Sequence, residues 1–262
     1  MRQTIDLPTI DLNADLGESF GPWRMGDDAA LLDIVSSANI ACGFHAGDWD
    51  VMAGAMARAV AKGTGIGAHP GFADLQGFGR FRMQVPHSSV ANMVRYQLGA
   101  AQAMARAAGG AVRHLKLHGA LANMACEDRA LARACYEGAL SVDPDLILMV
   151  IAGTAQQQAA ADLGCRVACE IFADRAYNAD ATLVDRSLPG AVLHDPDAIA
   201  ARVLRMLDAR AILAEDGTRI PVRIDTICLH GDTPEAVSIA GALRRALTGA
   251  GIGIAPFSGA RL

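Results

Sequence analysis

Lysine is scarce in this chain of 262 residues. Only Lys62 and Lys116 are lysines among its 23 basic side chains, and the net charge is −5. The arginines form no basic run, whereas binding to a nucleic-acid backbone depends on clustered cations. We therefore expect no nucleic-acid partner. Lys116 lies between two leucines, where a strand would direct it into a packed interior or a functional site.

Long apolar runs are also missing. No stretch approaches the roughly 20 uninterrupted apolar residues that a membrane helix needs. Carboxylates stand among the first 18 residues, where a signal peptide has its apolar segment. We therefore expect a cytoplasmic protein without membrane contact. The six cysteines form no CxxC pair, and we expect reduced, mostly buried thiols.

Two nucleotide-binding motifs are absent as well. The sequence has neither the GxGxxG of a dinucleotide fold nor the GK[ST] of a P-loop. Their absence counts against an open, doubly wound nucleotide-binding sheet. We also expect no covalent serine or cysteine nucleophile.

Apolar, strand-like segments alternate with helical ones along the whole chain. The expected strands are residues 9–17, 38–43, 65–70, 114–119, 146–153, 166–173 and 226–231, with a further candidate at 252–257. They are continuous apolar runs, which is typical of parallel strands covered by helices. The pattern predicts an α/β fold, a closed or nearly closed β/α barrel, with an open sheet as the alternative. No linker interrupts the chain, so residues 1–262 are expected to form one domain.

Polar residues follow the ends of most of these strands. Four apolar runs lead to a histidine beside glycine, alanine or proline: His45, His69, His118 and His230. Further polar residues near strand ends are Asn13, Asp15, Glu18, Asp48, Lys116, Glu170, Asp174, Arg175 and Asp232. In a parallel barrel the carboxyl ends of the strands share one rim. We therefore expect these side chains to surround one opening.

The chemistry of such a rim fits hydrolysis of an amide or an acyl phosphate. Histidine serves as general acid or base, and an aspartate beside it, as in His45 with Asp48 or His230 with Asp232, would orient the ring. Lysine and arginine would stabilise developing negative charge. Three histidines and an aspartate would also suit a divalent metal, so metal-free and metal-dependent versions both remain open.

Simpler interpretations compete with this one. A single histidine at a strand end is more often a hydrogen-bonded core residue than a catalyst. Asp174 and Arg175 could form a structural ion pair, and Lys116 could extend to the surface. Two long loops, residues 71–87 and 174–196, follow strand ends and are expected to serve as binding loops or lids.

Six stretches carry a family resemblance. DLNADLGESFG, SANIACGFHAGD, GAHPGFADLQGFGR, KLHGAL, EIFADRAY and DTICLHGD run in order from residue 11 to residue 232. On these stretches the chain resembles the LamB/YcsF family. The resemblance implies a distorted seven-stranded β/α TIM-like barrel, similar to that of polysaccharide deacetylases. It also implies that 5-oxo-L-proline, ATP and water give L-glutamate, ADP and phosphate, in a complex with B and C subunits.

The resemblance also implies roles for individual residues. Catalytic roles fall on Asp15, His45, His69, Lys116, His118, Glu170, Asp174, Arg175, His230 and Asp232. Substrate-binding roles fall on Asn13, Glu18, Arg80 and Arg186. ATP, with Mg²⁺, is implied as a co-substrate, and no residue is assigned to a resident metal.

The sequence departs from the family pattern at four places beside the expected opening. Leu117, Ala122, Phe81 and Asp185 stand where the family tends to have proline, tyrosine, arginine and proline. Two other functions remain open at this point. One is a metal-dependent deacetylase or amidohydrolase that works without ATP, and the other is a non-catalytic scaffold subunit.

Overall fold

The strands of the computed structural model, which describes residues 8–231 and 235–262, close into a barrel. Within these ranges the ring contains seven parallel strands: β1 (Thr9–Leu16), β2 (Ser37–Ala41), β3 (Gly65–His69), β4 (Val112–Lys116), β5 (Ile147–Ile151), β6 (Arg166–Phe172) and β9 (Thr226–Leu229). Each strand from β1 to β6 pairs with the next, and β9 closes the ring by pairing with both β6 and β1. Closure decides between the two predicted architectures in favour of the barrel.

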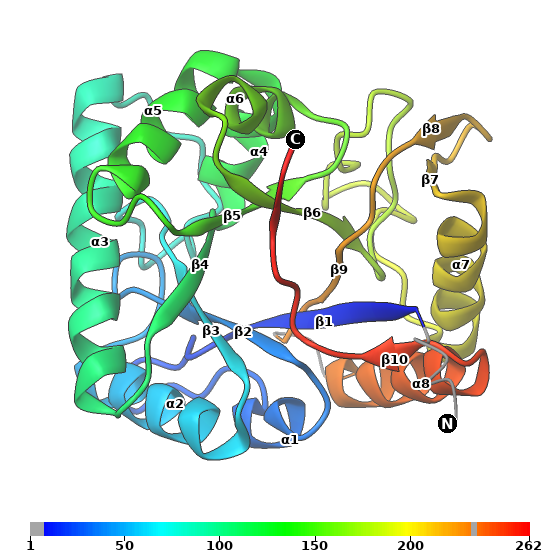
Figure 1. Ribbon diagram of the computed structural model, residues 1–262, viewed down its shortest axis with the longest axis horizontal. Helices are drawn as coiled ribbons and strands as arrows, with labels where there is room; N and C mark the ends of the chain where they lie inside the picture. Colours follow the sequence, from blue (N-terminus) through cyan, green and yellow to red (C-terminus); the bar gives the residue numbers. More distant parts are fainter. Residues whose placement is uncertain (1–7, 232–234) are drawn as a thin grey trace, which may run out of the picture.

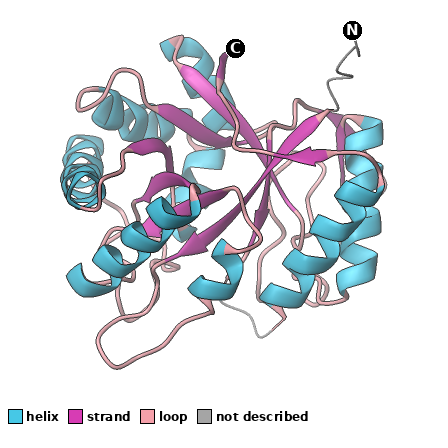
Figure 2. Cartoon of the chain, turned by 60° about the horizontal axis from the view of Figure 1, so that its bottom comes forward, coloured by secondary structure: helices cyan, strands magenta, loops and turns pink. Residues whose placement is uncertain are grey.

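Helices surround this ring, as Figures 1 and 2 show. They are α1 (Asp28–Leu32), α2 (Trp49–Lys62), α3 (His87–Ala107), α4 (Gly119–Glu127), α5 (Arg129–Leu140), α6 (Ala155–Leu163), α7 (Pro196–Ala209) and α8 (Ala236–Gly249). Strands β2, β3 and β5 are buried at every position, because one side faces the barrel interior and the other faces helices. None of the described helices is long and apolar enough to cross a membrane.

Local sequence signals explain where the helices begin and which side they bury. Asp48 is the N-cap of α2, since its side chain accepts a hydrogen bond from the backbone N–H of Val51. Gly63 ends the same helix in the left-handed conformation, at φ 69°. In α3, Val90, Val94, Leu98, Ala101 and Ala105 are all buried at three- and four-residue spacings.

Several elements differ from the sequence-based expectation. Helix α4 begins at Gly119, the last residue of the expected strand 114–119, and was not predicted. A hairpin of β7 (Ala211–Leu213) and β8 (Arg219–Pro221) was not predicted. Of the candidate strand at residues 252–257, only β10 (Gly253–Ile254) forms, and it pairs with the start of β1. A further short strand, β11 (Ala260–Arg261), pairs antiparallel with β6.

The long loop at 174–196 is more regular than expected. Two isolated antiparallel bridges, Arg175 to Val192 and Tyr177 to Leu183, fold it back on itself. The hydroxyl of Tyr177 accepts a hydrogen bond from the backbone N–H of Phe172, so the fold-back is tied to the end of β6. The segment is therefore a fixed wall beside the barrel opening.

A hydrogen-bonded polar network fills part of the barrel interior. Asn39 donates to Asn13 Oδ1 at 2.7 Å and to Asp15 Oδ1 at 2.9 Å, and its own Oδ1 lies 2.8 Å from His114 Nε2. Asn13 in turn donates to Thr226 Oγ1 at 2.7 Å. These groups are buried, and their mutual bonds offset the cost of removing them from water. The network fixes the strands that carry the functional side chains.

Gly67 makes room for this network, which gives a stability prediction. A Cβ at Gly67 would lie 2.0 Å from His114 Nε2, so Gly67→Ala must displace the His114 ring. We expect a loss of about 1–3 kcal/mol in the free energy of unfolding, as for other overpacked interiors.

The matched control is Gly99→Ala in α3, where a Cβ meets nothing within 4 Å. It should leave stability unchanged or raise it by up to about 1 kcal/mol. Urea denaturation of both variants measures the difference. Equal stability of the two would contradict the proposed packing role of Gly67.

Candidate active site

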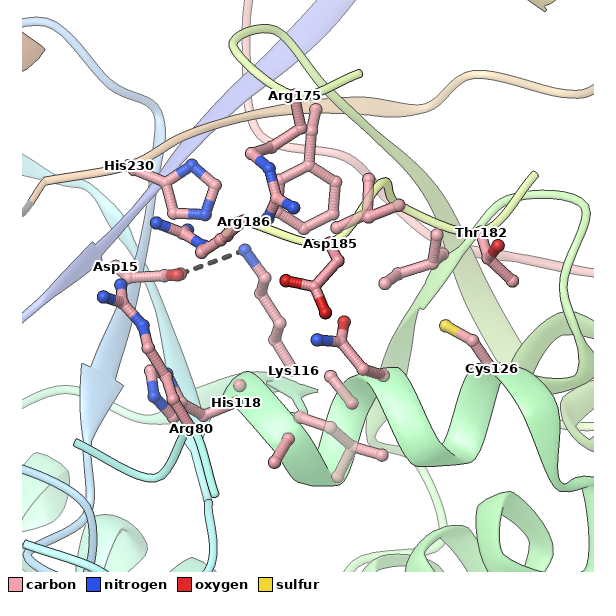
Figure 3. A pocket seen from close by; sticks show the side chains of 18 of the residues that line it. Asp15, Arg80, Lys116, His118, Cys126, Arg175, Thr182, Asp185, Arg186 and His230 are labelled. Carbon is pink, nitrogen blue, oxygen red and sulfur yellow. Dashed lines mark hydrogen bonds and ion pairs between the residues drawn. The ribbon is translucent and has the colours of Figure 1, made fainter. Parts of the chain in front are cut away.

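A cavity of about 400 Å³ opens at the carboxyl ends of the barrel strands. Side chains from β1, β3, β4 and β9, or from just beyond their ends, meet there with the 174–196 segment. Figure 3 shows Lys116, Arg175, Arg186 and His230 around the space beside Asp15. Sequence positions as distant as 15 and 230 thus share one opening, as the rim argument predicted.

Lys116, the last residue of β4, is the centre of the buried charge. Its Nζ lies 3.0 Å from Asp15 Oδ1 and 2.9 Å from Glu170 Oε1, and 2.9 Å from Cys228 Sγ. The Phe172 ring covers it, with Nζ 5.0 Å from the ring centroid. The ammonium is 4% exposed, so it does not extend to the surface and instead borders the cavity.

The two carboxylates that contact Lys116, Asp15 and Glu170, have pKa values shifted in opposite directions. Burial alone raises the pKa of Asp15, but His69 and Lys116 outweigh it and hold that pKa well below its usual range. Burial raises the pKa of Glu170, and Lys116 offsets this only in part. Burial would lower the pKa of Lys116, yet Asp15 leads the charges that keep it well above the ordinary value. The ion pair of Lys116 with Asp15 is therefore the charged core of the site.

A second group of side chains lies beside this core. The nitrogens His69 Nε2 and His118 Nδ1 are 3.0 Å apart, and the ring of His45 stacks on that of His118 with centroids 3.6 Å apart. Glu18 Oε1 lies 3.7 Å from His45 Nε2 and 3.8 Å from His118 Nδ1. His69 Nε2 is also 3.3 Å from Asp15 Oδ2. Each of these histidines comes from a different strand end.

His230 belongs to a separate pair on the other side of the opening. Its Nδ1 lies 2.8 Å from Asp174 Oδ2 and 2.9 Å from Oδ1. Burial alone raises the pKa of Asp174, but His230 brings it below its ordinary value. The carboxylate thus fixes the ring, and Nε2 is the ring nitrogen left for the cavity that His230 lines.

One of the two expected histidine–aspartate pairs is contradicted by these contacts. The predicted pairing of His45 with Asp48 is wrong, because Asp48 is half-buried at the N-terminus of α2 and accepts from backbone N–H groups of Val51 and Gly21. Among the described residues, Asp174 pairs with His230 Nδ1, and the predicted pairing of His230 with Asp232 stays a prediction. Asp232 itself lies outside the described residues. Nor do Asp174 and Arg175 form the simple ion pair considered above, since Arg175 donates to the carbonyls of Val184 and Ala191.

Arginines add positive charge to the cavity wall. Arg80, Arg175 and Arg186 all line it. Burial and the nearby guanidinium of Arg186 lower the pKa of Arg175 to about 10. Such crowding of like charges raises the local positive potential, which favours an anionic ligand.

The predicted site residues divide into two layers. The following line the cavity: Asp15, Glu18, His69, Arg80, Lys116, His118, Arg175, Arg186 and His230. The others among the described residues are buried behind it: Asn13, His45, Glu170 and Asp174. Asn13 in particular is bonded within the barrel network and does not reach the cavity wall.

Some contributors were not predicted from the sequence. Cys228 and Phe172 contact Lys116. Asn39 donates a hydrogen bond to Asp15, and His114 in turn contacts Asn39. The only hint in the sequence was that Asn39 and His114 are polar residues inside apolar strands. Residues 17–21, GESFG, match the GxSxG pattern of a nucleophile elbow, but no helix follows. Ser19 instead accepts from the backbone N–H of Met25, so it does not form such an elbow.

The four departures from the family pattern also differ in position. Leu117 and Ala122 are buried in the cavity wall, and Asp185 lines the opening from the 174–196 segment. Phe81 is 67% exposed and is not part of the wall. Leu117, Ala122 and Asp185 therefore shape the space that a ligand meets.

The fold and the site together define a distorted β/α barrel of the polysaccharide-deacetylase type with a charged cavity at the carboxyl ends of its strands. A solved structure with this fold, the catalytic domain of a peptidoglycan N-acetylglucosamine deacetylase from Eubacterium rectale, covers 97% of the chain and 90% of its own length with a TM-score of 0.53. At 9% identity this likeness concerns the fold alone. The chain belongs to the LamB/YcsF family, whose sequence model matches residues 10–261.

More similar relatives cover nearly the whole chain. A protein from Ruegeria pomeroyi, named as the A subunit of 5-oxoprolinase, is 64% identical over 248 residues, 95% of this chain and 98% of its own. One of the same name from Rhodopseudomonas palustris (strain BisB18) is 53% identical over 97% and 100% of the two chains. The crystal structure of a lactam utilization protein from Thermus thermophilus superposes with a TM-score of 0.89 at 43% identity, over 95% of this chain and all of that one.

The buried ion pair generates a prediction about stability. Lys116→Met leaves Asp15 and Glu170 buried without their cation, and we expect a loss of about 3–5 kcal/mol in the free energy of unfolding. The loss should shrink as the pH falls. Without Lys116 the pKa of Glu170, which burial already raises, rises further above its unfolded value, so the folded state binds protons more strongly and gains stability on acidification.

Chemical denaturation between pH 5 and pH 8 measures this effect. The matched control is the triple variant Asp15→Asn, Lys116→Met, Glu170→Gln, which removes the buried charges together and should recover part of the stability. A Lys116→Met protein as stable as the wild type at every pH would show that the ion pair does not support the fold.

Proposed function

We propose that this chain acts as the A subunit of an ATP-dependent 5-oxoprolinase, which opens the lactam of 5-oxo-L-proline to give L-glutamate. The observation that carries the proposal is the near full-length match, at 64% identity, to a relative that bears the name of that subunit. The Thermus protein, named for lactam utilization, supports the same substrate class. The positive cavity is consistent with it, because 5-oxoproline carries a carboxylate and ATP adds phosphates.

The lactam requires activation because a five-membered cyclic amide is stable and its amine is a poor leaving group. In the proposed sequence the lactam oxygen attacks the γ-phosphorus of ATP, and ADP leaves. Water adds to the activated carbon, and the C–N bond breaks so that the nitrogen becomes the amino group of glutamate. The resulting acyl phosphate is hydrolysed by a second water, which releases phosphate. Two waters and one ATP are consumed for each lactam.

Cations on the cavity wall suit the charges that develop in these steps. In the proposed mechanism, Lys116 and Arg175 stabilise the transferred phosphoryl oxygens and the oxyanion formed when water adds. Asp15 and Glu170 fix the Lys116 ammonium, so little reorganisation is needed as charge develops. Arg80 and Arg186, nearer the opening, are placed to bind the anionic ends of the substrates.

The His230–Asp174 pair is proposed to activate the attacking water. With Nδ1 held by the carboxylate of Asp174, the ring presents Nε2 to the cavity as a general base. His69 and His118 line the same space and are further candidates for proton transfer, with His45 stacked behind His118.

Partner subunits and the position of ATP complete the proposal. The relatives are named as one lettered subunit of an enzyme, which supports a multi-subunit assembly, and we propose B and C subunits as the partners. ATP, as its Mg²⁺ complex, is proposed to bind at the cavity or at an interface that a partner shares, since the sequence has no P-loop.

Glutamate release from 5-oxoproline by the chain co-purified with its B and C subunits tests the function. We expect turnover that requires ATP and forms ADP and glutamate in equal amounts. Lys116→Ala and His230→Ala should each lower kcat by at least about 100-fold, the usual cost of losing a charge-stabilising or general-base group. His194→Ala is the control, because that side chain is exposed on the 174–196 segment outside the cavity wall.

Two results would contradict the proposal. ATP-independent lactam opening or deacetylation by the chain alone would favour an ordinary hydrolase. Near-normal turnover by both variants in the assembled complex would favour a scaffold whose cavity takes no part in the chemistry.

A separate variant tests the role of Asp174 as a positioning residue. Asp174→Asn keeps the volume but cannot hold His230 in the same tautomer, so we expect kcat to fall at least about 10-fold with KM nearly unchanged. Steady-state kinetics on the complex provide both values, and Asp174→Glu should restore part of kcat. A change confined to KM would instead place Asp174 in substrate binding.

A further inference from the structure

Four potential ligand atoms converge at the inner edge of the cavity. Glu18, His45, His69 and His118 each offer one donor atom, and these atoms all lie within 4.8 Å of one another. The residues follow or end β1, β2, β3 and β4 respectively, so four successive strands deliver them. All four are buried. We call this group the Glu18–His118 cluster.

The hydrogen bonds of two histidines fix where their lone pairs point. His69 Nδ1 lies 2.9 Å from the carbonyl of Lys116, and His118 Nε2 lies 2.8 Å from the carbonyl of Phe78. A carbonyl only accepts, so both of these nitrogens carry hydrogen. In the neutral rings the lone pairs are then on His69 Nε2 and His118 Nδ1, which face each other at 3.0 Å. Two facing lone pairs repel unless a cation lies between or beside them.

His45 provides an independent observation. Its side chain is fully buried, yet neither ring nitrogen has a hydrogen-bond partner. A Cβ on Gly71 would come within 2.7 Å of Nδ1, so backbone closely covers that side of the ring. Nε2 lies on the other side, 3.7 Å from Glu18 Oε1. That separation is too long for a hydrogen bond but fits two ligands bound at about 2.0–2.2 Å to one ion.

We propose that the Glu18–His118 cluster binds one divalent transition-metal ion. The ligands are the Glu18 carboxylate, His69 Nε2 and His118 Nδ1, and His45 Nε2 joins them once its ring turns out of the parallel stack that it forms with the His118 ring. Three imidazoles and one carboxylate favour an ion of the Zn²⁺ class over Mg²⁺, which prefers oxygen ligands.

The surroundings of the cluster match what a metal site needs. Ligating histidines usually donate their second N–H to a carbonyl or a carboxylate, as His69 and His118 do here. The cluster is enclosed, since His45 is fully buried and His69 and His118 are 1% and 4% exposed, so the ligand atoms are shielded from water on most sides. Glu18, His69 and His118 line the cavity, which gives the ion a path of entry.

Metal content of the untagged full-length chain tests the inference without any turnover, so its outcome is independent of the proposed reaction. The protein is loaded with Zn²⁺, dialysed against metal-free buffer and analysed for metal by mass spectrometry. We expect about one equivalent in the wild type. His45→Gln and His118→Gln should each lower the content at least tenfold, whereas His230→Gln, a histidine of the same cavity outside the cluster, should retain one equivalent.

A second measurement guards against variants that fail to fold. Co²⁺ titration of the wild type should give a saturable visible absorption band at one equivalent, which excess Zn²⁺ removes and excess Mg²⁺ does not. Less than about 0.1 equivalent of Zn²⁺ in the wild type and no Co²⁺ band would overturn the proposal. Retention of one equivalent by folded His45→Gln and His118→Gln proteins would overturn it equally.

Discussion

A single buried ammonium organises the cavity end of this barrel. Lys116 is surrounded by Asp15, Glu170, Cys228 and the Phe172 ring, which come from β1, β6 and β9. If one charged group of this set is removed, its partner stays buried without an opposite charge. Such a change lowers the free energy of unfolding far more than the loss of an ion pair at the surface does. The positions of three strands around β4 are therefore linked to one side chain. The same constraint presents a fixed positive charge to the cavity.

Parallel topology explains how remote residues come to share this opening. Each βα unit contributes the residues just after its strand, so neighbouring strands provide neighbouring side chains. β1 to β4 contribute the Glu18–His118 cluster, and β6 and β9 contribute the Asp174–His230 pair. Lys116 lies between these two groups. Histidines and arginines from several strand ends thus line one cavity.

The sequence predicted helix-covered parallel strands and the convergence of their ends, and it favoured a barrel over an open sheet without deciding between them. Continuous apolar runs indicated parallel strands, and the histidines after them indicated the rim. It could not identify the partner of His230, because Asp174 follows a different strand and only closure of β9 onto β6 brings the two together. The sequence-adjacent choice for His45, Asp48, failed because the N-terminus of α2 needs that carboxylate as its cap. The Asn39–His114 network escaped notice since polar groups inside apolar strands have no periodic signal.

The central claim is that Lys116 remains a charged ammonium, fixed by Asp15 and Glu170 at the cavity wall. The chain has only two lysines, so selective labelling of lysine side-chain nitrogens gives two signals, and Lys62→Arg assigns them. At pH 10.5, close to the ordinary pKa of a lysine, the Lys116 signal should keep the chemical shift of a fully protonated ammonium. A Lys116 signal that has already moved to the neutral-amine position at pH 8 would contradict the account.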